Sequence, residues 1–553
     1  MLKLKHGILE LTLSAIAIIV TASILLKAII DIDPNYDVWW YHLPFAARIW
    51  DIVPRETFIG DEKWFEPRFD GFPLLAHFLQ GFLWRITGRI QSTNLVNFLS
   101  IFSYFFFLKI YFQVPFYLAA IALWAIPLVT THTSTSFVDL FGNVGTSILV
   151  MMTYRFYLNQ QLPQKKELFI ACLGAAIAVN TKTQLQPLVF SILIFTGLRL
   201  AWLYWREKSS VIKFLKMLPT VLLATIIIFA SPVKNTILYR NPVYPIKVEV
   251  AGIVLNHKLT PEAYESGNRQ KNWLESVLEI NSTLHWTADQ WSPDASRIHR
   301  GGFFGAYVIF NILLLLSLSI YEFRHHQKST SAVGSQDART ALVTVLVMSI
   351  VPANFPQSHE LRYFMFWMIC LVSLNLSLLS RSHKLLCRPQ YLDGICRTKF
   401  GIPLDRSKLN NTTDSWDEPN RLHPVSVEQT NQKTRRWLHP RYMGLVYLVF
   451  LTIVLSKTGN FYGRPVFNSL EQRLASGVKP ELLNQIEPNG KVCLIIKPGL
   501  ANRKKVPLES QENAFLYSSY FHPELDYDYS VRAALNPESC GDRTIIPNSA
   551  TKK

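Results

Sequence analysis

The apolar stretches of the sequence constrain the fold more than any other feature. Most of them are about 20 residues long, and short polar segments separate them. The first covers residues 8–30, which is long enough to cross the hydrocarbon core of a bilayer. Hydrophobic residues make up 49% of the 553-residue chain and charged residues only 17%. The sequence therefore predicts an all-α polytopic membrane protein, because helices satisfy their backbone hydrogen bonds within one segment.

The Lys and Arg residues predict how often the chain crosses the membrane, since they concentrate in cytoplasmic loops. The apolar piece 74–87 is short and amphipathic, which suits either a span or a helix lying in the interface. Only the interfacial alternative places the basic clusters on one side, and it gives about eleven spans with a cytoplasmic N-terminus and an external C-terminus. We expect these spans near residues 8–30, 94–108, 114–130, 139–154, 168–180, 185–204, 212–231, 302–321, 340–353, 361–380 and 442–457.

The net charge of +17 does not indicate a nucleic-acid partner, because the Lys and Arg residues lie between apolar stretches rather than in one stripe. The expected counter-charges are anionic lipid head groups and a lipid phosphate or pyrophosphate. The basic first residues are similar to the start of a signal peptide. No small-residue cleavage site follows, so we expect an uncleaved anchor.

The membrane domain is expected to cover residues 1–380, with its larger external loops at 31–93 and 232–300. Residues 381–441 are polar and rich in Asn, Thr and Ser, which predicts a flexible cytoplasmic linker. The last span, at 442–457, follows this linker.

The C-terminal residues 458–553 predict a small external α/β lobe. An amphipathic helix is expected at 470–486 and a buried strand at 491–496. In an external lobe, Cys493 and Cys540 either form a disulfide or remain thiols, and the sequence leaves both alternatives open.

A dense group of polar and aromatic residues follows the first span directly, at 33–48. It contains two carboxylates, Asp33 and Asp37, together with His42 and Arg48. Such groups are costly at a membrane surface unless they bind or catalyse something. The two Asp residues are either caps of the helix that starts near Val38 or acid–base groups.

The pattern Asp37-x-x-x-Tyr41-His42-Leu43-Pro44 after a first span resembles the polytopic glycosyltransferases of the GT-C fold. The similarity is to the bacterial branch related to protein O-mannosyltransferases and to the aminoarabinose transferase of lipid A. The resemblance implies a catalytic carboxylate in the first external loop and a donor sugar on a polyprenyl phosphate. By position Asp37 matches that carboxylate, with Asp33 as the fallback.

Asp139, at the outer end of a predicted span, resembles the second acidic position of that family. The alternative is an acid in the first turn of a helix, where it stabilises the helix dipole. No Asp-x-Asp pair is present there, so the sequence gives no support for a divalent metal, which usually needs several oxygen ligands. No other cofactor is indicated.

Two external cations suit a phosphate anion. Lys182 lies between two apolar runs and resembles the family's Lys at that place, or it is a Lys that snorkels at a helix end. Arg362 and Tyr363, at the outer end of a late helix, resemble the family's Arg-Tyr signature, and Arg362 would bind the donor phosphate in a bidentate manner. Glu360 or His359 would orient Arg362, or Glu360 would only neutralise it.

Further candidates for substrate contacts lie in the external loops. The second loop contains an Asn-Pro-x-Tyr-Pro element that resembles one in the family, and we expect a lid or an acceptor-binding element there. Three Trp residues of that loop either stack on sugar rings or belong to an interfacial belt. The candidates are Tyr41, His42, Glu66 and Arg68 in the first loop, and Asn241, Tyr244, Trp273, Trp286 and Trp291 in the second.

These features predict an inverting transfer of a sugar from a polyprenyl-phosphate donor to a glycan, lipid or protein acceptor. The expected place is the periplasmic face of a bacterial inner membrane. Asp37 would act as general base, while Lys182 and Arg362 would stabilise the leaving phosphate.

Two alternatives remain. A lipid-linked glycan ligase or polymerase would rely on paired Arg and His in a late external loop. A transporter or flippase would show ionisable residues at the middle of the membrane and internal repeats, and the sequence shows neither.

Overall fold

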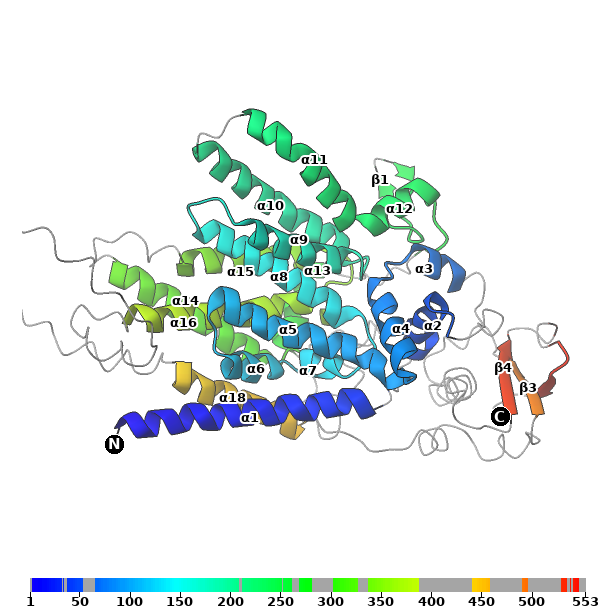
Figure 1. The fold of residues 1–553 in the computed structure, drawn as a ribbon, viewed down its shortest axis with the longest axis horizontal. Helices are drawn as coiled ribbons and strands as arrows, with labels where there is room; N and C mark the ends of the chain where they lie inside the picture. The colour runs from blue at the N-terminus through cyan, green and yellow to red at the C-terminus, as the bar shows by residue number, and fades with distance from the viewer. Residues whose placement is uncertain are drawn as a thin grey trace, which may run out of the picture.

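The structure of the protein is a computed structural model. It describes residues 2–31, 33, 37–52, 65–207, 211–250, 252–260, 268–280, 302–326, 337–386, 440–457, 490–495, 529–534, 538 and 541–546. Within these ranges most residues are helical. Figure 1 shows long helices that run in roughly one direction, with short helices gathered at one end of the bundle.

The long helices and one bent pair make up the bundle. α16 lies at its centre, because its most apolar stretch is completely buried and it packs against α5, α6, α8, α14, α15 and α18. The bounds are α1 Leu2–Ile30, α5 Leu95–Phe112, α6 Phe116–Trp124, α7 Pro127–Thr133, α8 Asp139–Leu158, α9 Lys165–Val179, α10 Leu185–Arg206, α11 Val211–Ile228, α14 Gly305–His326, α15 Asp337–Ala353, α16 Met365–Leu386 and α18 Pro440–Lys457.

Five helical segments in the described part of the chain are long and apolar enough to cross a membrane. The number rises to seven if each of two bent pairs counts as one span. The predicted helical architecture with several membrane-crossing helices is confirmed to this extent. The count of about eleven, the orientation and the kind of membrane stay predictions.

Two of the expected spans are bent rather than straight. The predicted span 114–130 consists of α6 and α7, which meet at 99°, and the predicted span 212–231 continues from α11 into α12 after a bend of 79°. Pro127 occupies the first position of α7. A proline there cannot donate the hydrogen bond that would continue α6, which favours a break at this point.

Three buried polar side chains connect α18 to the rest of the bundle. Asn375 on α16 donates through Nδ2 to the carbonyl oxygen of Asn311 on α14, at 2.8 Å. The hydroxyl of Tyr447 on α18 donates to Asn311 Oδ1 at 3.2 Å. Since all three residues are completely buried, these bonds hold three helices together where water is excluded.

The short elements at one end of the bundle follow α1 and α11, except η6, which follows α15. They include the α4 helix, whose 13 residues span about 20 Å, too short to cross a hydrocarbon core of about 30 Å. The bounds are η1 Val38–His42, α2 Leu43–Ile49, α3 Phe65–Gly71, α4 Leu75–Thr87, η3 Ile90–Asn94, α12 Ala230–Tyr239, β1 Glu249–Val250, β2 Ile253–Val254, α13 Arg269–Leu278 and η6 Leu361–Phe364.

The two predicted external loops lie at the same end of the bundle, where α3 and α12 are neighbours (Figure 1). Asn235 donates through Nδ2 to the carbonyl oxygens of Gly71, at 2.8 Å, and of Tyr244, at 3.2 Å. A Cβ atom at Gly71 would lie only 2.4 Å from the Tyr244 carbonyl oxygen. The close approach of the two backbones therefore requires glycine at this position.

Three parallel strands follow late in the sequence, in the order β4-β3-β5. They are β3 Gly490–Ile495, β4 Tyr529–Ala534 and β5 Thr544–Ile546, and β3 coincides with the predicted strand 491–496 within one residue. The predicted helix 470–486, most of the linker 381–441 and Cys540 lie outside the described residues. The α/β lobe as a whole and its disulfide therefore stay predictions.

Candidate functional site

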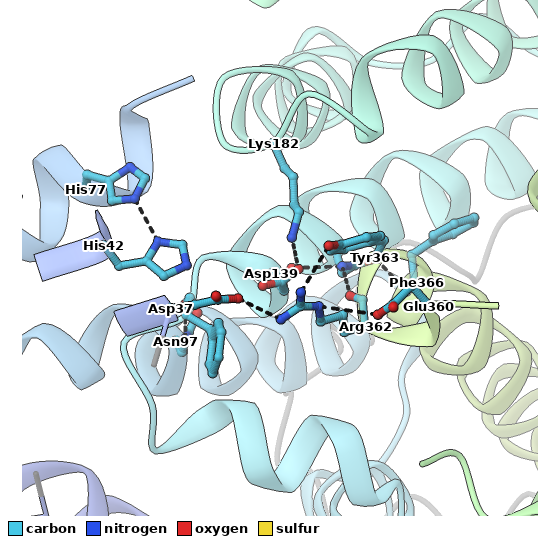
Figure 2. A network of polar contacts seen from close by, with 12 residues as sticks. Asp37, His42, His77, Asn97, Asp139, Lys182, Glu360, Arg362, Tyr363 and Phe366 are labelled. Carbon is cyan, nitrogen blue, oxygen red and sulfur yellow. Dashed lines mark hydrogen bonds and ion pairs between the residues drawn. The ribbon is translucent and has the colours of Figure 1, made fainter. Parts of the chain in front are cut away.

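Four segments that are far apart in the sequence bring charged side chains together at the end of the bundle that carries the short helices (Figure 2). Asp37 immediately precedes η1, and Asp139 is the first residue of α8. Lys182 lies in the turn between α9 and α10, and Arg362 lies in η6. The cluster thus joins four of the residues that the sequence predicts to be functional.

Arg362 is the centre of the cluster and is itself buried. Its Nη1 atom donates to Asp37 Oδ2 at 3.1 Å, and its Nη2 atom donates to the Tyr363 hydroxyl at 3.0 Å. Its Nε atom lies 3.7 Å from Glu360 Oε2, which is ion-pair distance but longer than a hydrogen bond. Arg362 therefore contacts both an acid predicted to be catalytic and an acid predicted to orient it.

A second ion pair lies beside the first. The Lys182 ammonium donates to Asp139 Oδ1 and stands 4.0 Å from the centre of the Tyr363 ring. The Tyr363 side chain thus touches both cations, one through its hydroxyl and the other through its ring face.

The close approach of α8 and α9 sets the distance between Asp139 and Lys182. Where the helices cross, Gly145 and Gly174 face each other, and a Cβ atom on either would lie 2.7 Å from the carbonyl oxygen of the other. Asp139 begins α8 and Lys182 follows the end of α9, so both residues lie at the same end of this crossing. Small residues at a helix crossing allow the close contact that the ion pair needs.

Asn143 holds η6 against α8. Its Nδ2 atom donates to the carbonyl oxygens of Asp139, at 2.8 Å, and of Arg362, at 3.1 Å. Its Oδ1 atom accepts from the backbone N–H of Phe366 at 2.9 Å. Asn143 is not among the residues predicted from the sequence, although an amide one helical turn after Asp139 in an apolar segment is a signal for it.

The two acids that face the cations differ in exposure. The side chain of Asp139 is 1% exposed and that of Asp37 is 29% exposed. Asp37 is therefore the acid that a substrate can reach, whereas Asp139 is enclosed with Lys182.

Burial changes the protonation of two groups beside the cluster. It lowers the pKa of the Lys182 ammonium to about 8, against the opposing attraction of Asp139. It raises the pKa of the Glu360 carboxyl to about 8, although Arg362 and Lys182 act in the opposite direction. Below this pH each cation faces one carboxylate, Asp139 or Asp37, and a neutral Glu360 adds no third negative charge that would repel an anionic ligand.

Both cations keep N–H groups for a ligand. A guanidinium has five N–H donors and an ammonium has three. Among the described residues, Arg362 uses one donor for Asp37 and one for Tyr363, and Lys182 uses one for Asp139. The remaining donors could bind phosphate oxygens without either ion pair breaking completely.

Two histidines extend the site toward α4. His42 Nδ1 and His77 Nε2 lie 2.9 Å apart, so one of the two nitrogens donates a hydrogen and the other accepts it. Burial lowers the pKa of His77 to about 3, and burial followed by the nearby His77 holds the pKa of His42 well below its usual value. Both rings are therefore neutral at physiological pH. His42 was a candidate, whereas the sequence gave His77 no role because only the fold pairs it with a residue 35 positions earlier.

The fallback acid Asp33 lies elsewhere and has a different contact. Its Oδ2 atom accepts a hydrogen bond from the backbone N–H of Ser136 at 3.0 Å, and the side chain is buried. Gln80 and Asn97 donate to backbone oxygens of the same segment, Gln80 to Ser136 and Asn97 to Thr135 and Phe137. Asp33 thus helps to fix the segment that leads into Asp139.

Tyr41 belongs to the site. Burial, and next the charge of Asp37, raise the pKa of its phenol well above the usual value, while Arg362 acts in the opposite direction. His359 is buried next to Glu360 in the chain. The roles of Tyr41 and His359 stay predictions.

The other predicted residues of the external loops make structural contacts. Glu66 accepts a hydrogen bond from Arg48 at 2.6 Å, and Arg68 lies on the same short helix, α3. Asn241 is buried and donates to the carbonyl oxygens of Ile246 and Asn256, which shapes its loop.

The aromatic residues of the second loop pack against other rings. The Tyr244 ring stacks on Tyr239 with the ring centres 4.0 Å apart. Trp273 is buried and meets the Trp367 ring edge to face at 5.5 Å, so its ring is covered by protein. Trp286 and Trp291 lie outside the described residues.

Comparisons with models of protein families, with curated proteins and with solved structures find no match. The resemblance to GT-C glycosyltransferases therefore depends on the sequence motifs alone. In the described part of the chain, no three or more His, Cys, Asp and Glu side chains are grouped so that they could hold a metal ion.

Proposed function

We propose that the protein is a membrane-embedded glycosyltransferase that uses a polyprenyl-phosphate-linked sugar as donor and acts at the outer face of a bacterial inner membrane. The observation that carries the proposal is the meeting of Asp37, Asp139, Lys182 and Arg362 at one end of a membrane-crossing bundle. Acids and cations are costly beside a bilayer, and a site for an anionic lipid accounts for their presence.

The proposed reaction is a single displacement. The oxygen or nitrogen of the acceptor forms a bond to the anomeric carbon as the bond from that carbon to the phosphate oxygen breaks, so the anomeric centre is inverted. The acceptor loses one proton to the Asp37 carboxylate, and the polyprenyl phosphate leaves with the bonding electron pair. Asp37 uses Oδ2 for Arg362, and among the described residues no hydrogen bond occupies Oδ1, which is the oxygen that would accept the proton.

The two cations would act on the leaving phosphate. Negative charge on the phosphate grows as its bond to the sugar breaks, and N–H donors that are already in position stabilise that charge more than the ground state. Arg362 is fixed by Asp37, Tyr363 and its backbone bond to Asn143, which supports such preorganisation. Asp139 would hold Lys182 in position rather than take part in proton transfer.

The test is a complementation experiment. A strain that lacks the gene is profiled for lipid-linked sugars and surface glycans by mass spectrometry, then supplied with the native chain or with Asp37→Asn. We expect the deletion to lose one sugar from its glycans and to accumulate the polyprenyl-phosphate sugar, and we expect Asp37→Asn to restore neither.

Asp51→Asn is the matched control. Asp51 lies in the same external loop, is exposed, and has a φ of 47°, a conformation that Asn tolerates well. This variant should restore the profile fully. If Asp37→Asn, present at the native level in the membrane, also restores it, Asp37 is not the base. If the deletion leaves every glycan unchanged, sugar transfer itself is wrong and transport of a lipid-linked sugar becomes the leading alternative.

A further inference from the structure

A groove of about 490 Å³ opens on the side of the bundle, far from the cluster around Arg362. Both α10 and α15 pack on α8, and the groove lies between them. Figure 1 shows these three helices beside one another. The lining is apolar apart from three threonines, Tyr157 and Arg339, and two of its side chains, Val343 and Phe195, are 51% and 41% exposed.

The size and lining of the groove suit a hydrocarbon chain. An apolar cavity of about 150 Å³ holds one benzene molecule, so this groove has room for a chain segment on the order of 18 carbon atoms. One wall of the groove is α10, which is long and apolar enough to cross a membrane. The hydrocarbon that surrounds such a helix is that of the lipid tails.

One cation marks the end of the groove at which a head group would lie. Arg339 is exposed near the start of α15, beside Tyr157 at the end of α8. Among the described residues no hydrogen bond or ion pair engages its guanidinium, whereas Arg381, at the same end of the bundle, pairs with Asp337 at 2.5 Å. An exposed guanidinium above an apolar groove complements a lipid with a negative head group.

We propose that this groove binds an anionic phospholipid, with one acyl chain between α10 and α15 and the phosphate on Arg339. The head group cannot be that of the proposed sugar donor. Tyr157 lies 18 residues after Asp139 on α8, which is about 27 Å at 1.5 Å per residue. A phosphate on Arg339 is therefore at the opposite end of the bundle, and in the opposite leaflet, from one on Lys182.

The test uses the purified full chain in detergent, titrated with phosphatidylglycerol or with zwitterionic phosphatidylcholine. The midpoint of thermal unfolding is measured at each lipid concentration. The native chain should bind phosphatidylglycerol more tightly. Arg339→Gln should weaken the binding of phosphatidylglycerol about fivefold, which is the loss expected for one basic residue near a lipid surface. The binding of phosphatidylcholine should not change.

Blocking the groove gives a second readout. Val343→Trp places a large ring in the groove at a half-exposed position, where the fold can accept it. This variant should weaken the binding of both lipids. Leu346→Trp is the control, because Leu346 lies on the same helix, is 58% exposed and does not line the groove. Arg206→Gln is the control for Arg339→Gln, since Arg206 is an exposed arginine at the end of α10.

Three results would overturn the proposal. In the first, Arg339→Gln binds phosphatidylglycerol as the native chain does. In the second, Arg206→Gln weakens the binding of phosphatidylglycerol as much as Arg339→Gln does, which would indicate a general attraction of the lipid to basic residues at this end of the bundle. In the third, polyprenyl phosphate displaces phosphatidylglycerol from the native chain, which would make the groove the place of the donor's tail. None of these results depends on transfer activity, so the site can fail while the proposed function stands.

Discussion

The two ion pairs of the site consist of the same kinds of groups, but they differ in how far water reaches them. Asp139 and Lys182 are enclosed where α8 crosses α9, with exposures of 1% and 12% for their side chains. In the other pair Arg362 is buried, at 6%, while Asp37 is 29% exposed. An enclosed pair has little freedom to separate, whereas the half-open pair can exchange its partner for a substrate. The difference assigns Asp139 to holding Lys182 in place for the phosphate and leaves Asp37 as the acid that meets the acceptor.

Removal of the enclosed cation should have the largest effect on stability. Lys182→Met leaves the Asp139 carboxylate buried without its partner, which typically costs about 3–5 kcal/mol. The midpoint of thermal unfolding of the purified chain measures the loss. The double variant Lys182→Met, Asp139→Leu should recover most of it, because neither position then leaves a buried charge without its partner. A single variant as stable as the native chain would show that the pair is not enclosed.

Removal of the amide that connects the two pairs should cost less. Asn143→Ala leaves the Phe366 N–H and the Arg362 carbonyl oxygen without their bonds, a loss of about 2–3 kcal/mol for buried groups. Because η6 carries Arg362, the binding of polyprenyl phosphate should weaken as well. Thr146→Ala, which removes a buried hydroxyl that donates to the Gly142 carbonyl oxygen on the same helix, serves as control. Unchanged lipid-phosphate binding in Asn143→Ala would mean that η6 keeps its position without this bond.

The charge of the site should change with pH in one direction. As pH rises through about 8, Lys182 loses its proton and Glu360 becomes a carboxylate, since both pKa values are about 8. Both changes oppose an anion, so polyprenyl phosphate should bind about tenfold more weakly at pH 9 than at pH 7. Glu360→Gln keeps position 360 neutral and should reduce this drop. Binding that strengthens with pH would contradict the assignment of Lys182 and Glu360.

The half-open pair should matter least for stability. Asp37→Asn keeps the shape of the side chain, and its amide oxygen can still accept from the buried Arg362, so the free energy of unfolding should fall by about 1–2 kcal/mol, less than in Lys182→Met. The midpoints of thermal unfolding of Asp37→Asn and Lys182→Met, measured together, compare the two pairs directly. A loss as large as that of Lys182→Met would mean that the two pairs have the same role. If the loss of stability is small and Asp37→Asn still fails in complementation, the failure reflects lost catalysis rather than unfolding.

The sequence predicts the individual charged residues of the site better than their surroundings. Apolar length and the position of basic loops were enough to place Asp37, Asp139, Lys182 and Arg362 on one side of a bundle. The contacts that fix these residues come from pairs far apart in the chain, such as Asn143 with Arg362 at 219 positions, and neither period nor composition indicates which pairs meet.

The first loop shows the same limit. Asp33 and Asp37 are four residues apart and chemically identical, so the sequence left both as candidates. Only the fold reveals that Asp33 accepts a bond from Ser136, 103 positions later, while Asp37 faces Arg362. The bend between α6 and α7 was also missed, because the apolar length alone predicts one straight span, although Pro127 inside that stretch is a sequence signal for the break.

The polar contacts of α18 have a consequence for the order in which the chain is assembled. A ribosome completes residues 387–439 before it makes the helix that carries Tyr447. Until then Asn311 and Asn375 face each other inside the bundle and the acceptor at Asn311 Oδ1 lacks the Tyr447 hydroxyl. Among the described residues Asn311 Oδ1 then accepts from Asn375 Nδ2 alone, at 3.1 Å, so the nascent bundle lacks one buried hydrogen bond and is less stable than the finished one. α18 therefore acts as a latch, which stabilises the membrane domain only after translation has passed residue 440.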